Sequence, residues 1–428
     1  MDRSSPLHAP LSVATHTPVA PHRLRLRTDP LNLRFDPNEH EASSHFTYHQ
    51  PRAEKALALG IQMRNAGHVF VCGPSGTARK TIIEAALERY AKPVEPLRDY
   101  LSVFPITRER QRPVWMGLPA GNGRSFLGCV DESVRACQDK LRTLILHCAQ
   151  DPEEALDETH RRTWIRDVEE GLAARVEQFR RKGFDPDVTE YLQSLHTALA
   201  ARMRESLELT LLHSAGNGGP QGLERLLDRA ERLAEYRPQA IREITAEQVP
   251  VVFEPNPTFN NLFGCVGKDE ARSDGSASER VLFQSGSLLK AQGGFLLLDF
   301  EEVAAEPDVW RHLKRCLRHE HLEIPVLETP HGRQIGLLKP DPIPLKVRLL
   351  AWGDERLYQE FHERDPAFGE LFRIRADLDS QMDREEPNID GYLAFLRRCR
   401  KADGLLPFDS TAAASFIDAG AELAGRGS

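Results

Sequence analysis

The most constraining feature of this sequence is a short apolar run that ends in a carboxylate. Residues 295–298 are Phe-Leu-Leu-Leu; the pair Gly293-Gly294 precedes them and Asp299 follows directly. A continuous apolar run after a glycine turn predicts a strand buried on both faces of a parallel sheet. Such a strand delivers its last side chain to the sheet edge. Because Mg²⁺ prefers oxygen ligands, Asp299 is a candidate metal-facing residue.

A second strand-like run, residues 68–72, leads into a loop with two glycines. The loop reads Gly73, Pro74, Ser75, Gly76, Thr77, Ala78, Arg79, Lys80 and Thr81. A strand, a glycine loop and a helix in this order are typical of a phosphate-binding loop (P-loop). In such a loop backbone N–H groups and a lysine bind phosphates, and a hydroxyl binds Mg²⁺. Together with Asp299, the loop predicts a site for ATP and Mg²⁺.

Two registers of this loop remain open. Counted from Gly73, the last glycine position holds Ala78, the lysine position Arg79 and the hydroxyl position Lys80. With one extra residue in the loop, Lys80 supplies the cation and Thr81 the metal-binding hydroxyl. Ala78 carries a steric cost if its backbone adopts a positive φ. The alternative to nucleotide binding is a relic loop that keeps only the turn.

Hydrolysis requires a carboxylate that polarises the attacking water, and P-loop ATPases commonly place a glutamate directly after the strand-end aspartate. Here that position is Phe300, and Glu301 comes one residue later. In a continuing strand the two side chains would face opposite sides. If the strand ends at Asp299, the backbone can bring Glu301 into the site; otherwise Glu301 opens the next segment on the surface. We expect slow hydrolysis, which a glutamate at position 300 would raise.

Two further positions are candidates for contact with nucleotide. Asp354 follows the apolar run 345–352, where a polar residue can sense the γ-phosphate; a turn-forming role is the alternative. Arg373 lies where ring-forming ATPases carry an arginine that reaches into the neighbour's site, and Arg375 is a second candidate. For both arginines the alternative is a surface ion pair with a nearby aspartate such as Asp377.

Composition changes between the two halves of this site. Residues 131–246 are dense in charges, and apolar side chains recur there at helical spacing, as at Val168, Leu172, Val176 and Phe179. This predicts two or three long helices, either an ordinary helical subdomain or an antiparallel coiled coil. The end of the chain is helical again, with helices expected at 391–399 and 410–423. Leu31 to Phe35 is expected as a short strand, residues 99–105 as another, and residues 118–124 as turns.

Bulk properties exclude several classes of protein. The chain of 428 residues is long enough for two or three domains and carries a net charge of −8, which gives no support for nucleic-acid binding. It has no apolar run long enough to span a membrane, and residues 1–27 lack the apolar core of a signal peptide. Its seven cysteines are dispersed, with no CxxC pair. Such a set fits reduced thiols, so we expect a cytoplasmic protein.

These segments resemble the AAA+ module of the Lon-related ATP-dependent proteases, specifically the bacterial branch with a long helical insertion between the phosphate loop and the carboxylate strand. The most specific matching segments are Asn256 to Gly264 and Lys290 to Asp299. The other matching segments are residues 49–53, 73–81, 118–121, 251–255, 286–289, 344–354 and 365–383. The resemblance covers roughly residues 30–428.

The resemblance implies an α/β fold with a P-loop core, a parallel sheet and a small α-helical lid. It divides the chain into a disordered leader (1–29), a first core segment (30–130), a helical insertion (131–246), a second core segment (247–386) and a truncated lid (387–428). It implies a homo-oligomeric ring that unfolds protein substrates with ATP. No stretch corresponds to the family's proteolytic domain, so we expect at most a weak ATPase and no peptidase. The rival hypothesis is a non-hydrolysing pseudo-ATPase that acts as a scaffold.

Overall fold

The computed structural model describes residues 27–33, 35, 50–63, 67–103, 114–150, 158–181, 186–215, 220–244, 248–268, 281–325 and 341–425. Of the predicted leader (residues 1–29), residues 1–26 lie outside the described part of the chain. The chain divides into two compact units, one formed by residues 52–378 and the other by residues 1–51 with 379–428. Among the described residues, none of the helices combines the length and apolarity needed to cross a lipid bilayer.

The larger unit is built on a five-stranded parallel sheet, as the sequence predicts. Its spatial order is β12 (Ile374–Asp377), β1 (Val69–Cys72), β11 (Arg348–Gly353), β8 (Phe295–Asp299) and β5 (Val251–Glu254). All four neighbouring pairs are parallel. The register pairs Cys72 with Gly353 and Trp352 with Asp299, so the strands end along one edge. This α/β architecture confirms the predicted P-loop core.

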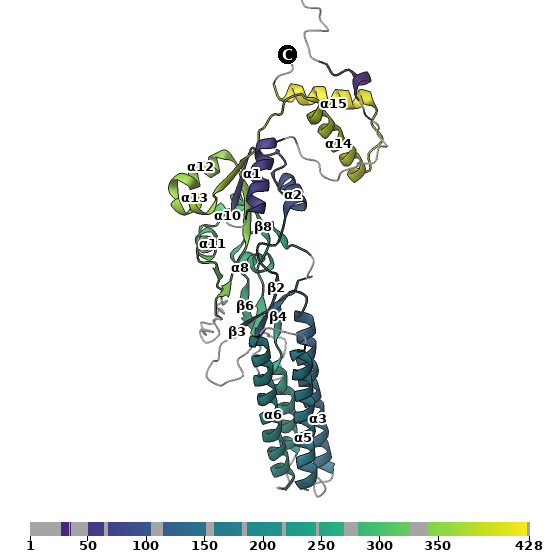
Figure 1. The fold of residues 1–428 in the computed structure, drawn as a ribbon, viewed down its shortest axis with the longest axis vertical. Coiled ribbons are helices and arrows are strands. Elements are labelled where there is room, and N and C mark those ends of the chain that lie inside the picture. The colour runs from purple at the N-terminus through teal and green to yellow at the C-terminus, as the bar shows by residue number, and fades with distance from the viewer. Residues whose placement is uncertain are drawn as a thin grey trace, which may run out of the picture. The chain divides into compact units, whose positions relative to one another are not determined.

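Helices cover both faces of the sheet (Figure 1). On one face lie α1 (Pro51–Gln62) and α2 (Arg79–Tyr90). A Cβ atom added at Gly60 of α1 would lie 2.3 Å from a methyl carbon of Val69, so only glycine permits this close helix–strand contact. The other face carries the main core and four helices: α10 (Phe300–Ala305), α11 (Pro307–His319), α12 (Glu355–Arg364) and α13 (Pro366–Leu371).

A smaller antiparallel sheet carries the helical insertion. Its order is β3 (Val114–Pro119), β2 (Arg98–Val103) and β4 (Gln239–Arg242). The strand expected at residues 99–105 is therefore present, in this second sheet. The turns expected at residues 118–124 are only partly right, because β3 runs to Pro119 and a helix begins at Gly123, with Gly121 at φ 83° between them.

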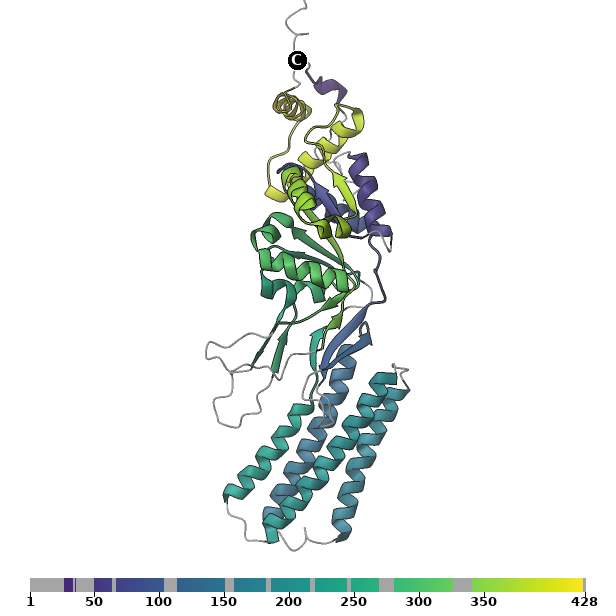
Figure 2. The same cartoon turned by 90° about the vertical axis from the view of Figure 1, so that its left-hand side faces the viewer.

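Within the described part of the insertion, four helices run alternately away from and back toward this sheet (Figure 2). They are α3 (Gly123–Gln150), α5 (Glu158–Arg180), α6 (Pro186–Ala215) and α7 (Pro220–Glu231), and a 3₁₀ turn, η3 (Arg232–Tyr236), follows. Apolar side chains of the insertion are buried between its helices, for example Val168 and Leu172 of α5 and Leu199 of α6. The insertion is therefore a helical bundle with its own core.

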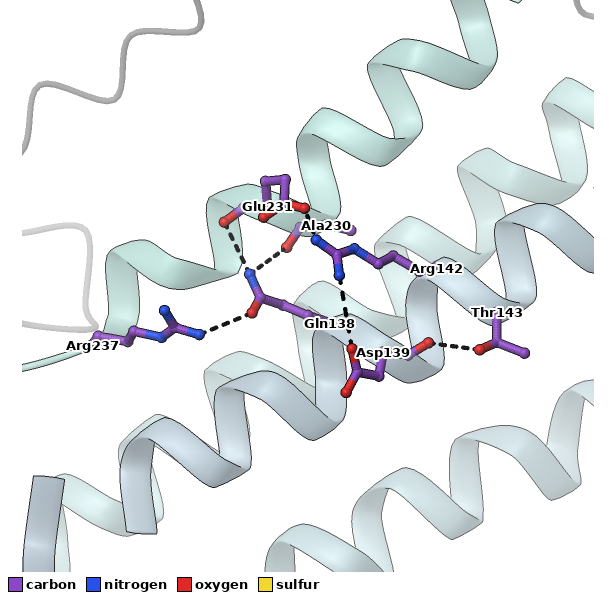
Figure 3. Close-up of polar contacts among 7 residues, drawn as sticks. All are labelled: Gln138, Asp139, Arg142, Thr143, Ala230, Glu231 and Arg237. Carbon is purple, nitrogen blue, oxygen red and sulfur yellow. Dashed lines mark hydrogen bonds and ion pairs between the residues drawn. The ribbon is translucent and has the colours of Figure 1, made fainter. Parts of the chain in front are cut away.

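A polar clamp fixes the point where α7 gives way to η3 (Figure 3). The buried amide of Gln138 donates to the carbonyls of Ala230 (3.3 Å) and Glu231 (3.2 Å), and its oxygen accepts from Arg237 (3.1 Å). Arg142 pairs with the Glu231 carboxylate. One side chain of α3 thus donates to two backbone carbonyls at this junction.

Polar contacts of the small sheet anchor the insertion and join it to the rest of the larger unit. The buried Asp99 carboxylate of β2 accepts from Gly123 N–H (2.7 Å), where α3 begins, and from Ile244 N–H (2.8 Å), just after β4. The buried Arg242 of β4 donates to the carbonyl of Gln292, at the turn before β8. The second contact connects the small sheet to the strand that ends in Asp299.

A hairpin and a pair of two-residue strands complete the described part of the larger unit. A hairpin of β6 (Cys265–Lys268) and β7 (Val281–Gln284) lies between α8 (Phe259–Phe263) and α9 (Ser287–Lys290). Two-residue strands, β9 (His321–Leu322) and β10 (Ile343–Pro344), pair antiparallel before β11.

The smaller unit contains α14 (Glu386–Asp403) and α15 (Ser410–Leu423), which cover the two helices expected at the chain end. Leu393 and Ile417 are in its core, and Leu33 and Phe35 pack against them. The short strand expected at Leu31 to Phe35 is wrong. Residues 30–32 form a 3₁₀ turn, η2 (Pro30–Asn32), because the Asp29 carboxylate caps Leu31 N–H at 3.0 Å.

Candidate functional site

The carboxyl edge of the parallel sheet gathers the predicted site residues except Arg373, which precedes β12 at the opposite edge. The phosphate loop follows β1, α10 follows Asp299 at the end of β8, and Asp354 follows β11. Ligands of open parallel sheets bind at this edge, where loops leave the strands. These segments are far apart in the sequence, and the parallel register brings them together.

The start of α2 matches the register counted from Gly73 at one position, Ala78. α2 begins at Arg79, and Ala78 precedes it in the left-handed conformation (φ 54°, ψ 34°). Ala78 is thus in the backbone state that the family pattern reserves for glycine, which confirms the expected steric cost. Gly76 also has a positive φ, 88°, and nothing lies within 4 Å of a Cβ built there. The loop keeps its turn despite the substituted glycine.

The first turn of α2 is open to an anion. No side chain caps the helix at Ala78, so the first N–H groups of a twelve-residue helix lack a side-chain partner there. Uncapped N–H groups and the helix dipole together form a binding site for phosphate. Thr77 turns its hydroxyl to the Pro74 carbonyl (2.8 Å), and Arg79 donates to the Gly73 carbonyl (3.3 Å). Both contacts hold the loop around its two glycines.

Asp299 ends β8 and caps the next helix. Its Oδ1 accepts from Glu301 N–H at 3.0 Å, and its Oδ2 accepts from the indole Nε1–H of Trp352 at 2.9 Å. Trp352 is the neighbour of Asp299 on β11, so the two side chains share a face of the sheet. Sequence reasoning missed Trp352. The pairing register, which the sequence alone does not give, is what reveals it.

Glu301 lies at the phosphate loop. Because the strand ends at Asp299 and α10 begins at Phe300, the backbone turns and brings the Glu301 carboxylate within 3.6 Å of the Arg79 guanidinium. The Glu301 side chain is 54% exposed and that of Arg79 is 12% exposed. Of the two alternatives for Glu301, this geometry matches the one in which the strand ends and the carboxylate reaches the site.

Phe300 points the opposite way. Its side chain is fully buried among aromatic rings of the main core, with ring centres 5.0 Å from Phe361, 5.2 Å from Trp310 and 5.3 Å from Phe368. The expectation that a glutamate at position 300 would restore a catalytic carboxylate is therefore wrong. Such a carboxylate would be buried in the core, away from the loop.

Lys80 and Thr81 lie on the first turn of α2. The Lys80 ammonium lies 3.7 Å from the centre of the Phe253 ring and 3.7 Å from the Glu84 carboxylate. Phe253 in turn lies against Trp352, with ring centres 5.8 Å apart. Thr81 is half-buried. Lys80 is held over an aromatic ring, and Arg79 is the cation that lies in the loop.

Asp354 and the two arginines have protein partners. The Asp354 carboxylate caps α12 by accepting from Leu357 N–H at 2.7 Å. Arg375 is ion-paired with Asp377 (2.6 Å) and with Glu355, which matches the ion-pair alternative for this residue. The exposed Arg373 donates from Nε to the carbonyl of Glu370 at 3.1 Å.

A thiol and two carboxylates meet beside the loop. The Cys72 thiol, one residue before Gly73, donates to the Glu355 carboxylate at 3.2 Å, and Asp377 lies nearby. Burial and the bond to Glu355 raise the pKa of Cys72 to about 12, so the thiol stays protonated. Arg375 bridges both carboxylates and supplies the balancing charge of this cluster.

The residues present fit a nucleotide with a divalent cation. The uncapped start of α2 offers N–H donors to phosphate, Arg79 offers a cation, and Asp299 and Glu301 offer carboxylate oxygens. Asp299 uses one acceptor position on each oxygen, and a carboxylate has about four. Thr81, at the start of α2, offers a hydroxyl.

Comparison with known proteins agrees with this geometry. A family described as LonB-like, AAA domain, matches residues 247–379, which include β5, β8, β11 and β12 of the parallel sheet. No curated protein matched the chain. An AAA domain is a nucleotide-binding module, and the matched segment contains both the carboxylate strand and the arginine-bearing strand. Residues 247–379 of the chain are therefore similar to the LonB-like AAA domain.

Proposed function

We propose that this chain binds ATP with Mg²⁺ and is the ATPase, or unfoldase, portion of a Lon-like ATP-dependent protease. The observation that carries the proposal is the contact between Arg79 and Glu301. It brings a carboxylate from the end of β8 to the loop at the start of α2. Together with the uncapped helix start, it forms a phosphate site flanked by acidic oxygens.

In this proposal each residue has a stated role. The N–H groups of the loop and Arg79 would hold the phosphates, and Asp299 would face the cation; in the register with one extra residue, Thr81 would face it as well. Glu301 polarises the attacking water in place of the buried Phe300. A bound Mg²⁺ would neutralise charge that develops on the phosphate oxygens. Ala78 and Arg79 replace the usual glycine and lysine, so we propose weak binding and slow turnover.

A rival function is a non-hydrolysing nucleotide-binding scaffold. The burial of Phe300 and the left-handed Ala78 favour it, because both depart from an efficient site. The position of Glu301 argues for hydrolysis. The two functions differ only in turnover, so they are separated by measuring binding and hydrolysis on the same preparation.

We further propose that the chain assembles with copies of itself into a ring and acts on unfolded protein chains. Arg373 is exposed, and within the part of the chain that the structure describes its guanidinium hydrogen-bonds only to a backbone carbonyl, so it is available to a neighbour's nucleotide. Mass photometry with and without ATP measures the assembly. Arg373→Ala should lower turnover without changing nucleotide binding, whereas Arg364→Ala, which loses an exposed pair with Glu360, should change neither.

The decisive experiment is a titration with a fluorescent ATP analogue. The unaltered chain should bind the analogue more tightly with Mg²⁺ than with EDTA. The double variant Arg79→Ala/Lys80→Ala should abolish binding, because it removes both cations at the start of α2. Lys92→Ala, an exposed cation just after α2, is the matched control and should bind normally.

Three outcomes would contradict the proposal. Absence of binding by a folded, unaltered chain would refute the nucleotide site. Undiminished binding by the double variant would place the nucleotide elsewhere. Binding without any release of phosphate in a single-turnover assay would favour the scaffold.

A further inference from the structure

The indole of Trp352 is built into the candidate cation site. It is 5% exposed, and its Nε1–H donates to Oδ2 of Asp299 at 2.9 Å. The backbone N–H of Glu301 donates to the other oxygen, Oδ1. Two donors on opposite oxygens fix the plane of the Asp299 carboxylate.

The Trp352 ring is itself held in place. The parallel register sets Trp352 beside Asp299, and the Phe253 ring of β5 lies against the indole at 5.8 Å and 31°. Lys80 covers the Phe253 ring. The indole therefore reaches Asp299 from a rigid strand and is supported by a second strand and by α2.

The chemistry of this donor suits a carboxylate that must keep its charge. An indole N–H donates and cannot accept, so it orients a carboxylate oxygen. Because the indole is uncharged, it does not neutralise the carboxylate as a lysine or arginine would. Groups that orient a metal-facing side chain in this way commonly change metal affinity by about 10- to 100-fold when removed.

We propose that Trp352 is a positioning residue for Asp299: its indole N–H holds the carboxylate in the orientation that receives the cation of a bound nucleotide. The inference rests on the proposed nucleotide function and adds a residue outside the loop and the carboxylate pair. Trp352 contacts Asp299 and acts through it.

The test removes the N–H and keeps an aromatic ring. For Trp352→Phe, the Mg²⁺ concentration at half-maximal binding of a fluorescent ATP analogue should rise about tenfold. Binding of the analogue in EDTA should be unchanged, because the loop contacts remain. Trp310→Phe, which removes another buried indole N–H that donates to Asp365, is the matched control and should shift the Mg²⁺ midpoint much less.

A second measurement does not depend on that variant folding. The chain has four tryptophans, so ¹⁵N-labelled tryptophan gives four indole N–H signals. The signal that moves on Asp299→Asn belongs to Trp352. In the nucleotide-bound, unaltered chain this signal should move when Mg²⁺ replaces EDTA.

The outcomes separate the inference from the function on which it rests. An unchanged Mg²⁺ midpoint in folded Trp352→Phe, or an indole signal that ignores Mg²⁺, would overturn the positioning role and leave nucleotide binding intact. An equal loss of binding with Mg²⁺ and with EDTA would assign Trp352 a purely structural role. Absence of nucleotide binding by the unaltered chain would overturn both.

Discussion

Arg79 and Glu301 form an ion pair of 3.6 Å between the phosphate loop and the start of α10. More than half of the Glu301 side chain is exposed, and exposed pairs of this kind contribute only about 0–1 kcal/mol to stability. The contact therefore places the Glu301 carboxylate beside the loop but contributes little to the stability of the fold. It makes the roles of the two residues separable by mutation.

Glu301→Gln should leave nucleotide binding and unfolding temperature nearly unchanged and lower turnover by about 10²–10⁴-fold, since a positioned base is lost. Phosphate release and analogue binding are measured side by side. Glu302→Gln, a change in the next, exposed carboxylate, is the control and should retain turnover. Equal turnover in both variants would mean that another group activates the water.

Phe300→Glu should fail to raise turnover and should destabilise the larger unit, because it puts a carboxylate among the rings of Phe361, Trp310 and Phe368. The loss should be at least about 3–5 kcal/mol, the range for losing a buried aromatic ring. Urea denaturation measures it. Phe300→Leu, which keeps an apolar side chain in the core, should cost less than Phe300→Glu. A stable, faster Phe300→Glu variant would show that residue 300 can face the loop.

Ala78→Gly should stabilise the protein. The left-handed backbone at φ 54° costs a non-glycine residue roughly 1–2 kcal/mol, and glycine avoids this cost. Against this gain, glycine loses more chain entropy than alanine on folding, which lowers stability by about 0.5–1 kcal/mol. We expect a net gain of about 0.5–1 kcal/mol by these figures. Ala85→Gly, in the middle of α2, should instead lose about 1 kcal/mol. If both variants lose stability, Ala78 does not hold this conformation in solution.

His68 should make the larger unit less stable in mild acid. Burial, followed by the nearby Arg348 and Arg373, lowers its pKa to about 3, and its Nδ1 accepts from Leu349 N–H at 3.1 Å. The unfolded chain binds a proton near pH 6.5, which the folded chain does not, so stability falls as pH drops below about 6.5. At pH 5 the loss should be about 2 kcal/mol.

His68→Asn keeps an acceptor for Leu349 and removes the titration, so it serves as the reference. Denaturation curves of both proteins between pH 7.5 and 5 give the difference. Stabilities that fall in parallel would show that other groups cause the acid sensitivity.

Gln138→Leu should destabilise the helical insertion by about 1–3 kcal/mol, because it removes the two hydrogen bonds to the carbonyls of Ala230 and Glu231, each contributing about 0.5–1.5 kcal/mol (Figure 3). Hydrogen exchange should rise in α7 and η3 and stay constant in β8. Lys140→Leu, on the exposed side of α3, should leave exchange unchanged. Uniform exchange in both variants would mean that apolar packing alone fixes the junction.

The sequence predicts the central strands well because they are apolar on both faces. A continuous apolar run is typical of a strand buried on both faces of a parallel sheet, and this holds for Phe295 to Asp299 and for Arg348 to Gly353. The glycine loop likewise fixes the start of α2. The helical insertion is predictable because its apolar spacing is helical over long segments.

The contacts across strands are not predictable in this way. Trp352 meets Asp299 only through the strand register, and Phe300 faces the core only because the strand ends one residue earlier. The direction of Glu301 depends on the same single residue. At Leu31 to Phe35, where the sequence predicts a short strand, the Asp29 cap and Pro30 favour a tight turn.

The Asp99 carboxylate accepts from the backbone N–H groups of both Gly123 and Ile244. The two ends of the helical excursion between these residues are therefore held at one carboxylate. An excursion with adjoining ends can be lengthened, shortened or exchanged without moving the strands on either side. Natural variation in this region should therefore appear as differences in the length of the helices, while the neighbouring sheet keeps its pairing. The same geometry makes the excursion a natural attachment point for a grafted domain.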